Sequence, residues 1–156
     1  MKWLFDTRAG GAGLILRLGL GIVMFPHGMG KLLGWFGGPG FAASYQMFTQ
    51  NMHIPAVLAV LVILAESLGA VGLIVGCLTR IAAFGLACDM IGAIAMVHWH
   101  NGFYMNWFGQ QAGEGYEYHL LAIAIGLALT IAGAGCCSID RLIAWLFFRK
   151  GESGIE

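Results

Sequence analysis

Residues 56–76 have the sequence AVLAVLVILAESLGAVGLIVG, and this stretch decides the fold class of the chain. About 20 apolar residues suffice to cross the hydrocarbon core of a membrane as a helix, and Glu66 is the only charged residue in the stretch. A charge near the centre of a bilayer costs about 2.5–3.5 kcal/mol on insertion scales. We therefore expect a membrane-spanning helix whose Glu66 carboxyl faces protein or water, which makes this carboxyl a candidate site residue.

Three further apolar stretches predict that the chain is an all-α membrane protein with a four-transmembrane-helix bundle. The predicted helices cover about residues 12–35, 55–78, 80–99 and 117–136 of a single domain, 1–156. The composition agrees, because 59% of the residues are apolar and only 10% are charged, whereas soluble domains carry about 25% charged residues. The 25 glycines suit helices that pack closely through small residues. A net charge of zero without a basic patch argues against a nucleic-acid partner.

The basic residues outside the predicted helices indicate the orientation of the chain. They precede the first helix, occupy the turn between the second and third, and follow the fourth: Lys2, Arg8, Arg80, Arg141, Arg149 and Lys150. The positive-inside rule therefore predicts that both termini are cytoplasmic. Residues 138–150, SIDRLIAWLFFRK, predict an amphipathic helix on the inner membrane surface. Residues 41–53 predict a short amphipathic or re-entrant piece after the first helix.

Polar side chains inside the predicted helices mark the candidate site. Glu66 and Asp89 fall near the midplane of the second and third helices, while His27 and Lys31 lie one turn apart on the outer half of the first. Pro26 removes a backbone donor beside His27, so we expect a kink that opens space there. These side chains can meet in a polar cavity inside the bundle.

Two further charges have open roles at this stage. Arg17 lies on the inner half of the first helix, where it can pair with Glu66 or Asp89. Such a pair is either purely structural, because buried ion pairs can simply fix helix register, or it couples Arg17 to the function of the site. Glu117 begins the fourth helix. It is either a solvated residue or an acidic first-turn residue that offsets the helix dipole.

The five histidines and four cysteines raise the question of haem and metals. His27 with His98 or His119 could ligate a haem from facing helices, but the sequence lacks metal-ligand spacing, so we predict no metal and regard haem as unlikely. The adjacent Cys136 and Cys137 fall on the cytoplasmic side, where thiols stay reduced. We expect them to pack as small apolar residues, and a redox or metal role is the minority alternative.

The motifs together resemble the DoxX family of small four-helix integral membrane proteins. The pieces that carry the resemblance are Arg17-Leu18-Gly19-Leu20-Gly21, His27-Gly28 with Lys31-Leu32, Gly34-Trp35-Phe36-Gly37-Gly38, Glu66, Gly76-Cys77-Leu78-Thr79-Arg80, Met90 with Ala95 and His98, Asn101-Gly102-Phe103, Glu117-Tyr118, and Gly133-Ala134-Gly135 with Ser138-Ile139-Asp140. The resemblance implies a four-helix membrane protein, and some relatives are subunits of quinone-linked sulfur oxidoreductases or of redox-stress membrane complexes. Asp89 and Cys136-Cys137 lie outside this pattern.

Our first functional hypothesis is a redox-associated membrane subunit that binds a quinone-like lipid and works with a partner oxidoreductase. His27 and Lys31 would polarise one quinone carbonyl, and Glu66 would supply or relay a proton. An apolar pocket would hold the ring, and the cofactor-binding residues we predict in addition to this trio are Met24, Phe25, Met96 and His98. The chain lacks a flavin, nicotinamide or iron–sulfur signature, so its electrons would come from the partner.

Two other functions compete with this hypothesis. One is a small-solute or proton transporter or exporter, since carboxylates at the midplane also suit a translocation path. Four helices are few for that task, so this version needs a homodimer or larger oligomer. The other is a membrane scaffold for partner proteins, with the buried charges acting only as locks. In each case we expect a multi-pass protein of the bacterial cytoplasmic (inner) membrane.

Overall fold

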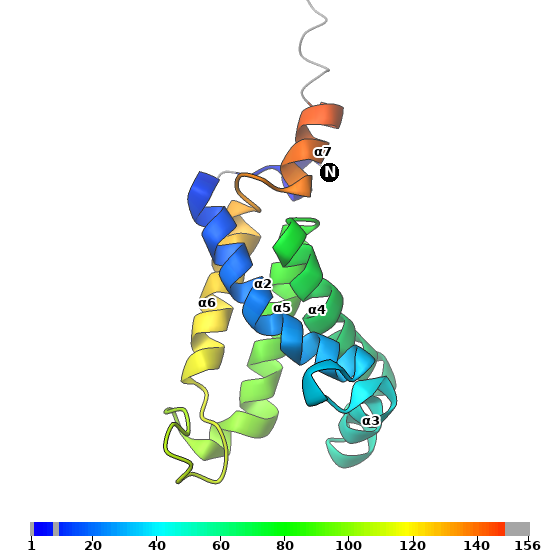
Figure 1. Cartoon of the computed structure of the whole chain (residues 1–156), viewed down its shortest axis with the longest axis vertical. Coiled ribbons are helices and arrows are strands. Elements are labelled where there is room, and N and C mark those ends of the chain that lie inside the picture. The colour runs from blue at the N-terminus through cyan, green and yellow to red at the C-terminus, as the bar shows by residue number, and fades with distance from the viewer. Residues whose placement is uncertain (1, 8–9, 149–156) are drawn as a thin grey trace, which may run out of the picture.

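The computed structural model describes residues 2–7 and 10–148. The regular secondary structure of these residues consists of helices, and they contain no strand (Figure 1). This confirms the predicted all-α class. The α-helices are α1 (Lys2–Phe5), α2 (Gly10–Leu33), α3 (Gly40–Gln46), α4 (Ala56–Val75), α5 (Thr79–Ala93), α6 (Glu117–Ala132) and α7 (Ile139–Phe148). Shorter helical turns join them: η1 (Trp35–Gly37), η2 (Met47–Asn51), η3 (Ile94–His98) and η4 (Trp99–Asn101).

Three helices are long and apolar enough to cross a membrane: Gly10–Leu33, Ala56–Val75 and Thr79–Asn101. They correspond to the first three predicted spans within a few residues at each end. The fourth predicted span, residues 117–136, is shorter than expected, because α6 has 16 residues and ends where Gly133 turns the chain with a φ of 82°. It is a shorter apolar helix, below the about 20 residues that a full crossing requires.

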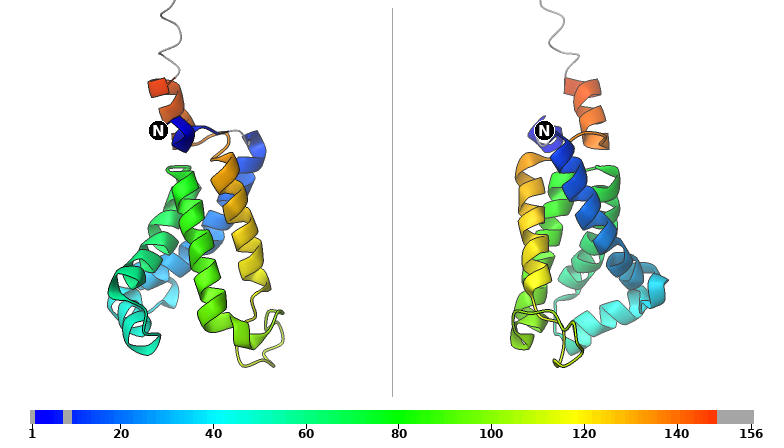
Figure 2. Two further views of the ribbon diagram at one scale, coloured as in Figure 1. Left: turned by 180° about the vertical axis from the view of Figure 1, so that it is seen from behind. Right: turned by 60° about the vertical axis from the view of Figure 1, so that its left-hand side comes forward.

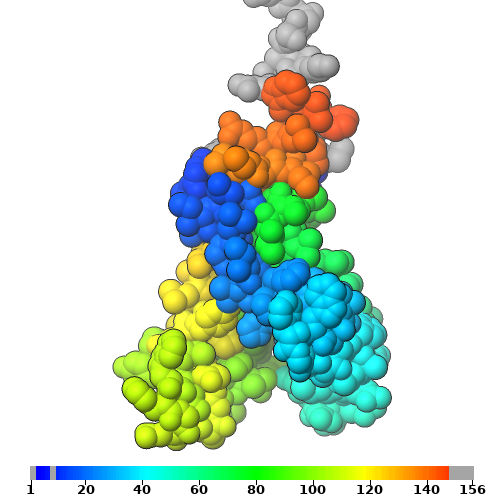
Figure 3. Space-filling view, in the orientation of Figure 1, coloured from blue at the N-terminus to red at the C-terminus, as the bar shows by residue number. Residues whose placement is uncertain are grey.

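The helices converge at one end of the molecule and separate toward the other (Figures 1 and 2). We call the end that carries α1 and α7 the terminal end, and the end that carries α3 and residues 102–116 the loop end. α2 packs mainly against α4, and α5 packs against both α4 and α6. A hollow separates α3 from the 102–116 loop at the loop end (Figure 3).

Two apolar cores hold these helices together. The larger core is built from α2, α4, α5 and α6, with Leu20, Met24, Ala70, Leu73, Ala83, Leu86, Met90, Ala122 and Leu129 fully or nearly fully buried. The smaller core packs Phe48 of η2 against Ala59 and Ile63 of α4. The segment predicted as a short amphipathic or re-entrant piece is therefore helical, and it is fixed to α4 through Phe48.

One stripe of α2 brings it into backbone contact with α4. The stripe follows positions i, i+4, i+7, i+11 and i+14: Arg17, Gly21, Met24, Gly28 and Lys31. A Cβ at Gly28 would lie 2.3 Å from the carbonyl oxygen of Glu66, so only glycine allows this approach. Small residues play this role at membrane helix interfaces generally. The contact places Lys31, three residues after Gly28, beside Glu66.

The C-terminal segment forms the predicted helix at the terminal end. Ser138 caps α7, because its Oγ accepts a hydrogen bond from the Arg141 N–H at 3.2 Å. The apolar side chains of Leu142, Trp145 and Phe147 are exposed on α7. Residues 149–150 of the predicted amphipathic segment, and Arg8 among the orienting charges, lie outside the described residues.

Candidate functional site

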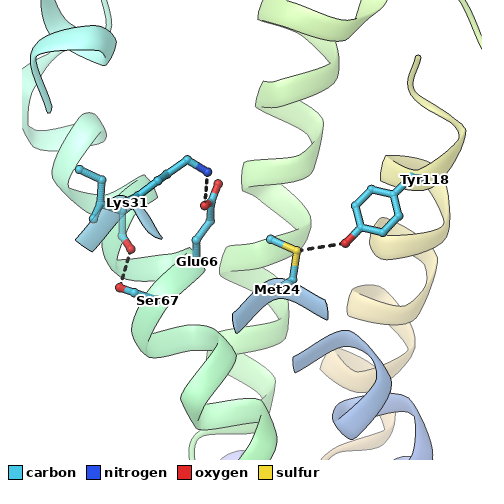
Figure 4. A network of polar contacts seen from close by, with 6 residues as sticks. Met24, Lys31, Glu66, Ser67 and Tyr118 are labelled. Atoms are coloured by element: carbon cyan, nitrogen blue, oxygen red, sulfur yellow. Dashed lines mark hydrogen bonds and ion pairs between the residues drawn. The ribbon is translucent and has the colours of Figure 1, made fainter. Parts of the chain in front are cut away.

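An ion pair between α2 and α4 forms the centre of the candidate site. The Lys31 Nζ donates to Oε2 of Glu66 (Figure 4), and the Lys31 and Glu66 side chains are 23% and 6% exposed, respectively. The backbone contact at Gly28 explains why the two meet, since it brings the helices together one turn before Lys31. The structure thus brings together two of the three residues that the sequence assigned to chemistry.

Asp89 of α5 adds a second carboxyl to this pair. Asp89 interacts electrostatically with Glu66 and with Lys31. The Asp89 Oδ2 is buried and has no hydrogen-bond partner in the part of the chain that the structure describes. Three helices therefore contribute one charged group each to a cluster of two carboxyls and one ammonium, which we call the charge cluster.

Met24 and Tyr118 lie next to the charge cluster and connect α2 to α6. The Tyr118 hydroxyl donates to the Met24 Sδ at 3.3 Å (Figure 4), and Tyr118 interacts electrostatically with Glu66. Met24 is only 2% exposed. It is therefore a core residue that lies between the cluster and α6.

A cavity of about 340 Å³ adjoins the same lysine. It is lined by Pro26, His27, Gly30, Lys31, Trp35, Phe36, Gly37, Gly38 and Pro39. Its volume falls within the range typical of small-molecule sites, about 300–1,000 Å³. His27 and Lys31 provide polar groups, and Trp35 and Phe36 provide aromatic walls. The cavity therefore suits a small aromatic ligand that accepts hydrogen bonds.

The structure places three of the predicted ring-binding residues, Met24, Phe25 and Met96, outside this cavity. Met24 is in the core, Phe25 packs edge-on against Phe36 with ring centroids 6.2 Å apart, and Met96 is 49% exposed on η3. None of the three lines the cavity. The sequence analysis missed Trp35 and Phe36, although an aromatic pair set between glycines after a predicted span was a usable signal for them.

The histidines divide between the cavity and the far side of α5 and α6. His27 is exposed and lines the cavity. The rings of His98 and His119 lie 4.1 Å apart, and the backbone oxygen of Glu114 is 2.8 Å from Nδ1 of His98. Among the described residues, no group of three or more His, Cys, Asp and Glu side chains is placed to hold a metal ion. His98 is therefore a partner of His119 and does not belong to the cavity.

Glu117 organises the loop at the loop end. Its Oε1 accepts hydrogen bonds from the backbone N–H of Met105 at 3.0 Å and from the Trp107 Nε1 at 3.4 Å. Glu117 is also the first residue of α6, where a negative charge is favourable to the helix dipole. Both observations favour a structural role for Glu117.

Arg17 does not pair with Glu66 or Asp89, which corrects that alternative from the sequence. Its guanidinium donates all five N–H groups to backbone carbonyls: Leu73 and Ile74 at the end of α4, and Ala134, Cys136 and Cys137 in the segment before α7, at 2.5–3.4 Å. The last carbonyls of a helix lack partners within the helix. Arg17 supplies them for α4, so its role is structural.

Asp140 and Arg80 form hydrogen bonds with unpaired backbone groups at two further helix ends. The Asp140 carboxylate accepts from the backbone N–H of Leu78 at 2.7 Å and of Thr79 at 2.9 Å, which caps α5. Arg80 donates to the carbonyls of Thr130 and Ile131 at 2.6 Å each, at the end of α6. We call Arg17, Arg80 and Asp140 the terminal clamp. Much of the motif pattern in the sequence belongs to this clamp.

Gly76 makes the clamp possible. It ends α4 with a φ of 70°, and a Cβ there would lie 2.5 Å from the Ser138 Cβ. The neighbouring Cys77 lies in the turn between α4 and α5, where burial and then Asp140 raise the pKa of its thiol. Cys136 and Cys137 bind Arg17 through their carbonyls, so their backbone contributes to the clamp whatever their thiols do.

Comparison with known proteins identifies relatives of this chain. A sequence model of the DoxX family matches residues 12–99, which contain nearly all of α2, the whole of α3 to α5 and the charge cluster. A protein of Bacillus subtilis (strain 168) named "Putative oxidoreductase CatD" is 32% identical over 130 residues, which cover 83% of this chain and 85% of that protein. No solved structure matches the chain.

Proposed function

Because the chain belongs to the DoxX family, we propose that it is a membrane-embedded, redox-associated subunit that binds a quinone-like lipid beside Lys31. One observation carries this proposal. Lys31 lines a cavity with aromatic walls and pairs with the buried Glu66 carboxylate, so a ligand in the cavity lies beside a residue that carries a donatable proton. The name of the Bacillus relative, an oxidoreductase, supports the same class of function.

The residues of the cavity have defined roles in this proposal. Trp35 and Phe36 hold the ring, and Lys31 and His27 donate hydrogen bonds to a carbonyl oxygen, where negative charge develops on reduction. The Lys31 ammonium gives one proton to that oxygen, Glu66 relays its replacement from water, and the second proton of the quinol comes from water at the cavity. A bound quinone contributes the redox chemistry, since it takes up two electrons and two protons to become a quinol. A partner oxidoreductase supplies the two electrons.

The proposal includes a membrane arrangement. α2, α4 and α5 with its extension to Asn101 cross the bilayer, and α6 crosses as a shorter fourth helix. Both termini face the cytoplasm of a bacterial cell, as the basic residues near the ends of the spans favour. α7 lies on the inner surface with its exposed apolar side chains in the lipid. This places the cavity on the outer half of the membrane.

The first test is quinone binding by the purified protein in detergent, followed through quenching of tryptophan fluorescence, to which Trp35 contributes. We expect His27→Leu to weaken binding about three- to tenfold, because a hydrogen bond contributes about 0.5–1.5 kcal/mol and 1.4 kcal/mol is about tenfold. His100→Leu, another exposed histidine outside the cavity, is the matched control. Absence of quenching by quinone, or equal affinity in both variants, would refute the proposal.

Transport is the second candidate function, and the charge cluster is the observation that favours it. Three helices of spanning length contribute Lys31, Glu66 and Asp89 to one place, and such groups inside a membrane often mark an ion or proton path. Protein reconstituted in vesicles with a pH-sensitive dye distinguishes the two functions. Proton flux without added quinone supports transport, whereas quinone binding without flux supports the redox subunit.

A further inference from the structure

We propose that the loop of residues 102–116 is an interfacial anchor, whose Trp107 and Phe108 side chains insert into the lipid at the loop end of the helix bundle. The partner of this surface is the boundary between the headgroups and the acyl chains of the bilayer that the helices cross. The inference rests on the membrane arrangement proposed above, and it is independent of quinone binding.

Two large apolar side chains are exposed near the middle of this loop. Trp107 is 80% exposed and Phe108 is 88% exposed. They belong to residues 101–113, NGFYMNWFGQQAG, a stretch without an acidic, basic or histidine side chain. Aromatic side chains are favoured at membrane interfaces, where apolar rings reach the acyl chains. An uncharged loop with two exposed rings therefore suits a lipid surface.

Hydrogen bonds within the loop prepare its backbone for an environment with little water. Oε2 of Glu114 accepts from the backbone N–H of Asn106 at 2.8 Å, and Glu117 accepts from that of Met105, as described above. The Asn106 side chain bonds both backbone groups of Gln111, since Oδ1 accepts from the N–H at 3.0 Å and Nδ2 donates to the carbonyl at 3.2 Å. Unsatisfied backbone groups are costly in lipid. These bonds therefore allow the folded loop to approach the acyl chains.

The side chains around the two rings define how deep the loop can lie. The Trp107 Nε1 already donates to Glu117, so its polar atom has a partner in the protein while the ring stays exposed. Phe108 has no polar side-chain atom to satisfy. Gln110 and Gln111 follow directly and are exposed, and their amides favour the hydrated headgroup region. The loop therefore belongs at the interface, with only the two rings reaching the acyl chains.

The length of α6 explains why the loop meets the lipid boundary. A helix of 16 residues is about 24 Å long, whereas the hydrocarbon core is about 30 Å thick. Arg80 ties the last carbonyls of α6 to the start of α5 at the terminal end, so the shortfall falls at the loop end. The loop that leads into α6 is thereby drawn to the edge of the hydrocarbon, and the anchor completes the crossing of this short helix.

Fluorescence quenching in vesicles tests the anchor. In a variant whose other four tryptophans are phenylalanine, Trp107 reports its own depth. The vesicles consist of phosphatidylcholine brominated either near the headgroup end of the acyl chain or near its methyl end, and iodide is present on both sides. We expect bromine near the headgroups to remove most of the Trp107 emission, deep bromine to remove less, and iodide to have little effect. If this variant does not fold, the difference in quenching between the native protein and Trp107→Phe supplies the same measurement.

Two aspartate substitutions in the same loop provide a matched pair. Phe108→Asp places a charge where the proposal places lipid, which is unfavourable, so we expect Trp107 to lose quenching by bromine and to gain quenching by iodide. Gln110→Asp adds the same charge on the headgroup side and should leave both unchanged. The two side chains are exposed, so both variants should melt in detergent at the native temperature.

The outcomes separate the anchor from the proposed function. Weak quenching by bromine together with strong quenching by iodide would overturn the anchor, and Trp107 would then face water or a partner protein. Equal quenching in the two aspartate variants would overturn it as well. Quinone binding by the native protein is measured in the same vesicles. Quenching by bromine without quinone binding supports the anchor and refutes the quinone proposal, and quinone binding without quenching by bromine does the opposite.

Discussion

Two cations on one stripe of α2 have opposite uses, and the chemistry of their side chains explains why. Arg17 presents five N–H donors in a rigid plane, which suits several carbonyls that converge from two segments. Lys31 presents a compact charge with three donors on a flexible stem, which suits a single carboxyl. The arginine therefore joins several backbone segments, whereas the lysine pairs with one side chain.

Arg17→Lys should destabilise the protein although it conserves the charge. A lysine has three donors, so at least two of the five carbonyls lose their partner, and a buried unsatisfied group costs about 1–3 kcal/mol. We expect the free energy of unfolding to fall by about 2–4 kcal/mol, measured by denaturant titration in detergent. Arg141→Lys, exposed on α7, is the control and should change stability by less than about 0.5 kcal/mol. Equal stability of the two variants would contradict the clamp.

At the scale of elements, the contact between α2 and α4 positions the site. Glycine at position 28 lets the two backbones touch, and this contact decides that Lys31 meets Glu66. α2 ends at Leu33, and the chain then turns through η1, whose residues line the cavity. The geometry of the site therefore depends on a residue without a side chain.

Gly28→Ala should disrupt the site by separating α2 from α4. The added methyl would lie 2.3 Å from a backbone oxygen that cannot rotate away. Overpacking of this kind costs about 1–3 kcal/mol, and we expect a lower melting temperature together with loss of quinone binding. Gly19→Ala is the matched control on the same helix, where nothing lies within 4 Å of the new Cβ. If both variants melt and bind alike, the contact does not position Lys31.

The sequence was a good guide to the elements and a partial guide to the site. Apolar length predicts α2, α4 and α5 because a spanning helix needs a fixed number of apolar residues. The sequence grouped Lys31 and Glu66 among the polar side chains that can meet in one cavity, but it did not predict their pairing, because Glu66 falls near the midplane and Lys31 on the outer half. The role of Arg17 was not predictable, because its partners are backbone carbonyls that carry no sequence signal. Trp35 and Phe36 were not predicted as walls of this cavity because they come from a turn, and turn geometry is not visible in helical periodicity.

At the scale of the whole molecule, the terminal clamp and the candidate site lie at different positions along the helix bundle. The terminal end carries α1, α7 and the clamp, and the loop end carries α3, the 102–116 loop and the hollow between them (Figures 1 and 3). The proposed orientation places these two ends on opposite sides of the membrane. This arrangement is directly testable, because each end offers an exposed position for labelling.

Cysteine labelling in intact cells should distinguish the two ends. In a chain whose Cys77, Cys88 and Cys136 are serine, an impermeant maleimide should leave the exposed Cys137 unlabelled and should label Gln110→Cys in the loop. Lysed cells, in which both positions should react, are the control. Labelling of Cys137 but not of position 110 in intact cells would indicate the reverse orientation. Labelling of both positions would show that α6 does not cross.

The terminal clamp also has a mechanical consequence. The helices are held together at the terminal end and separate toward the loop end. A small change in the angle between two helices therefore displaces residues near the clamp only slightly and displaces residues at the loop end the most. The guanidinium and carboxylate bonds of the clamp fix the pivot. Thermal motion should therefore widen and narrow the hollow at the loop end, while the clamped end moves little.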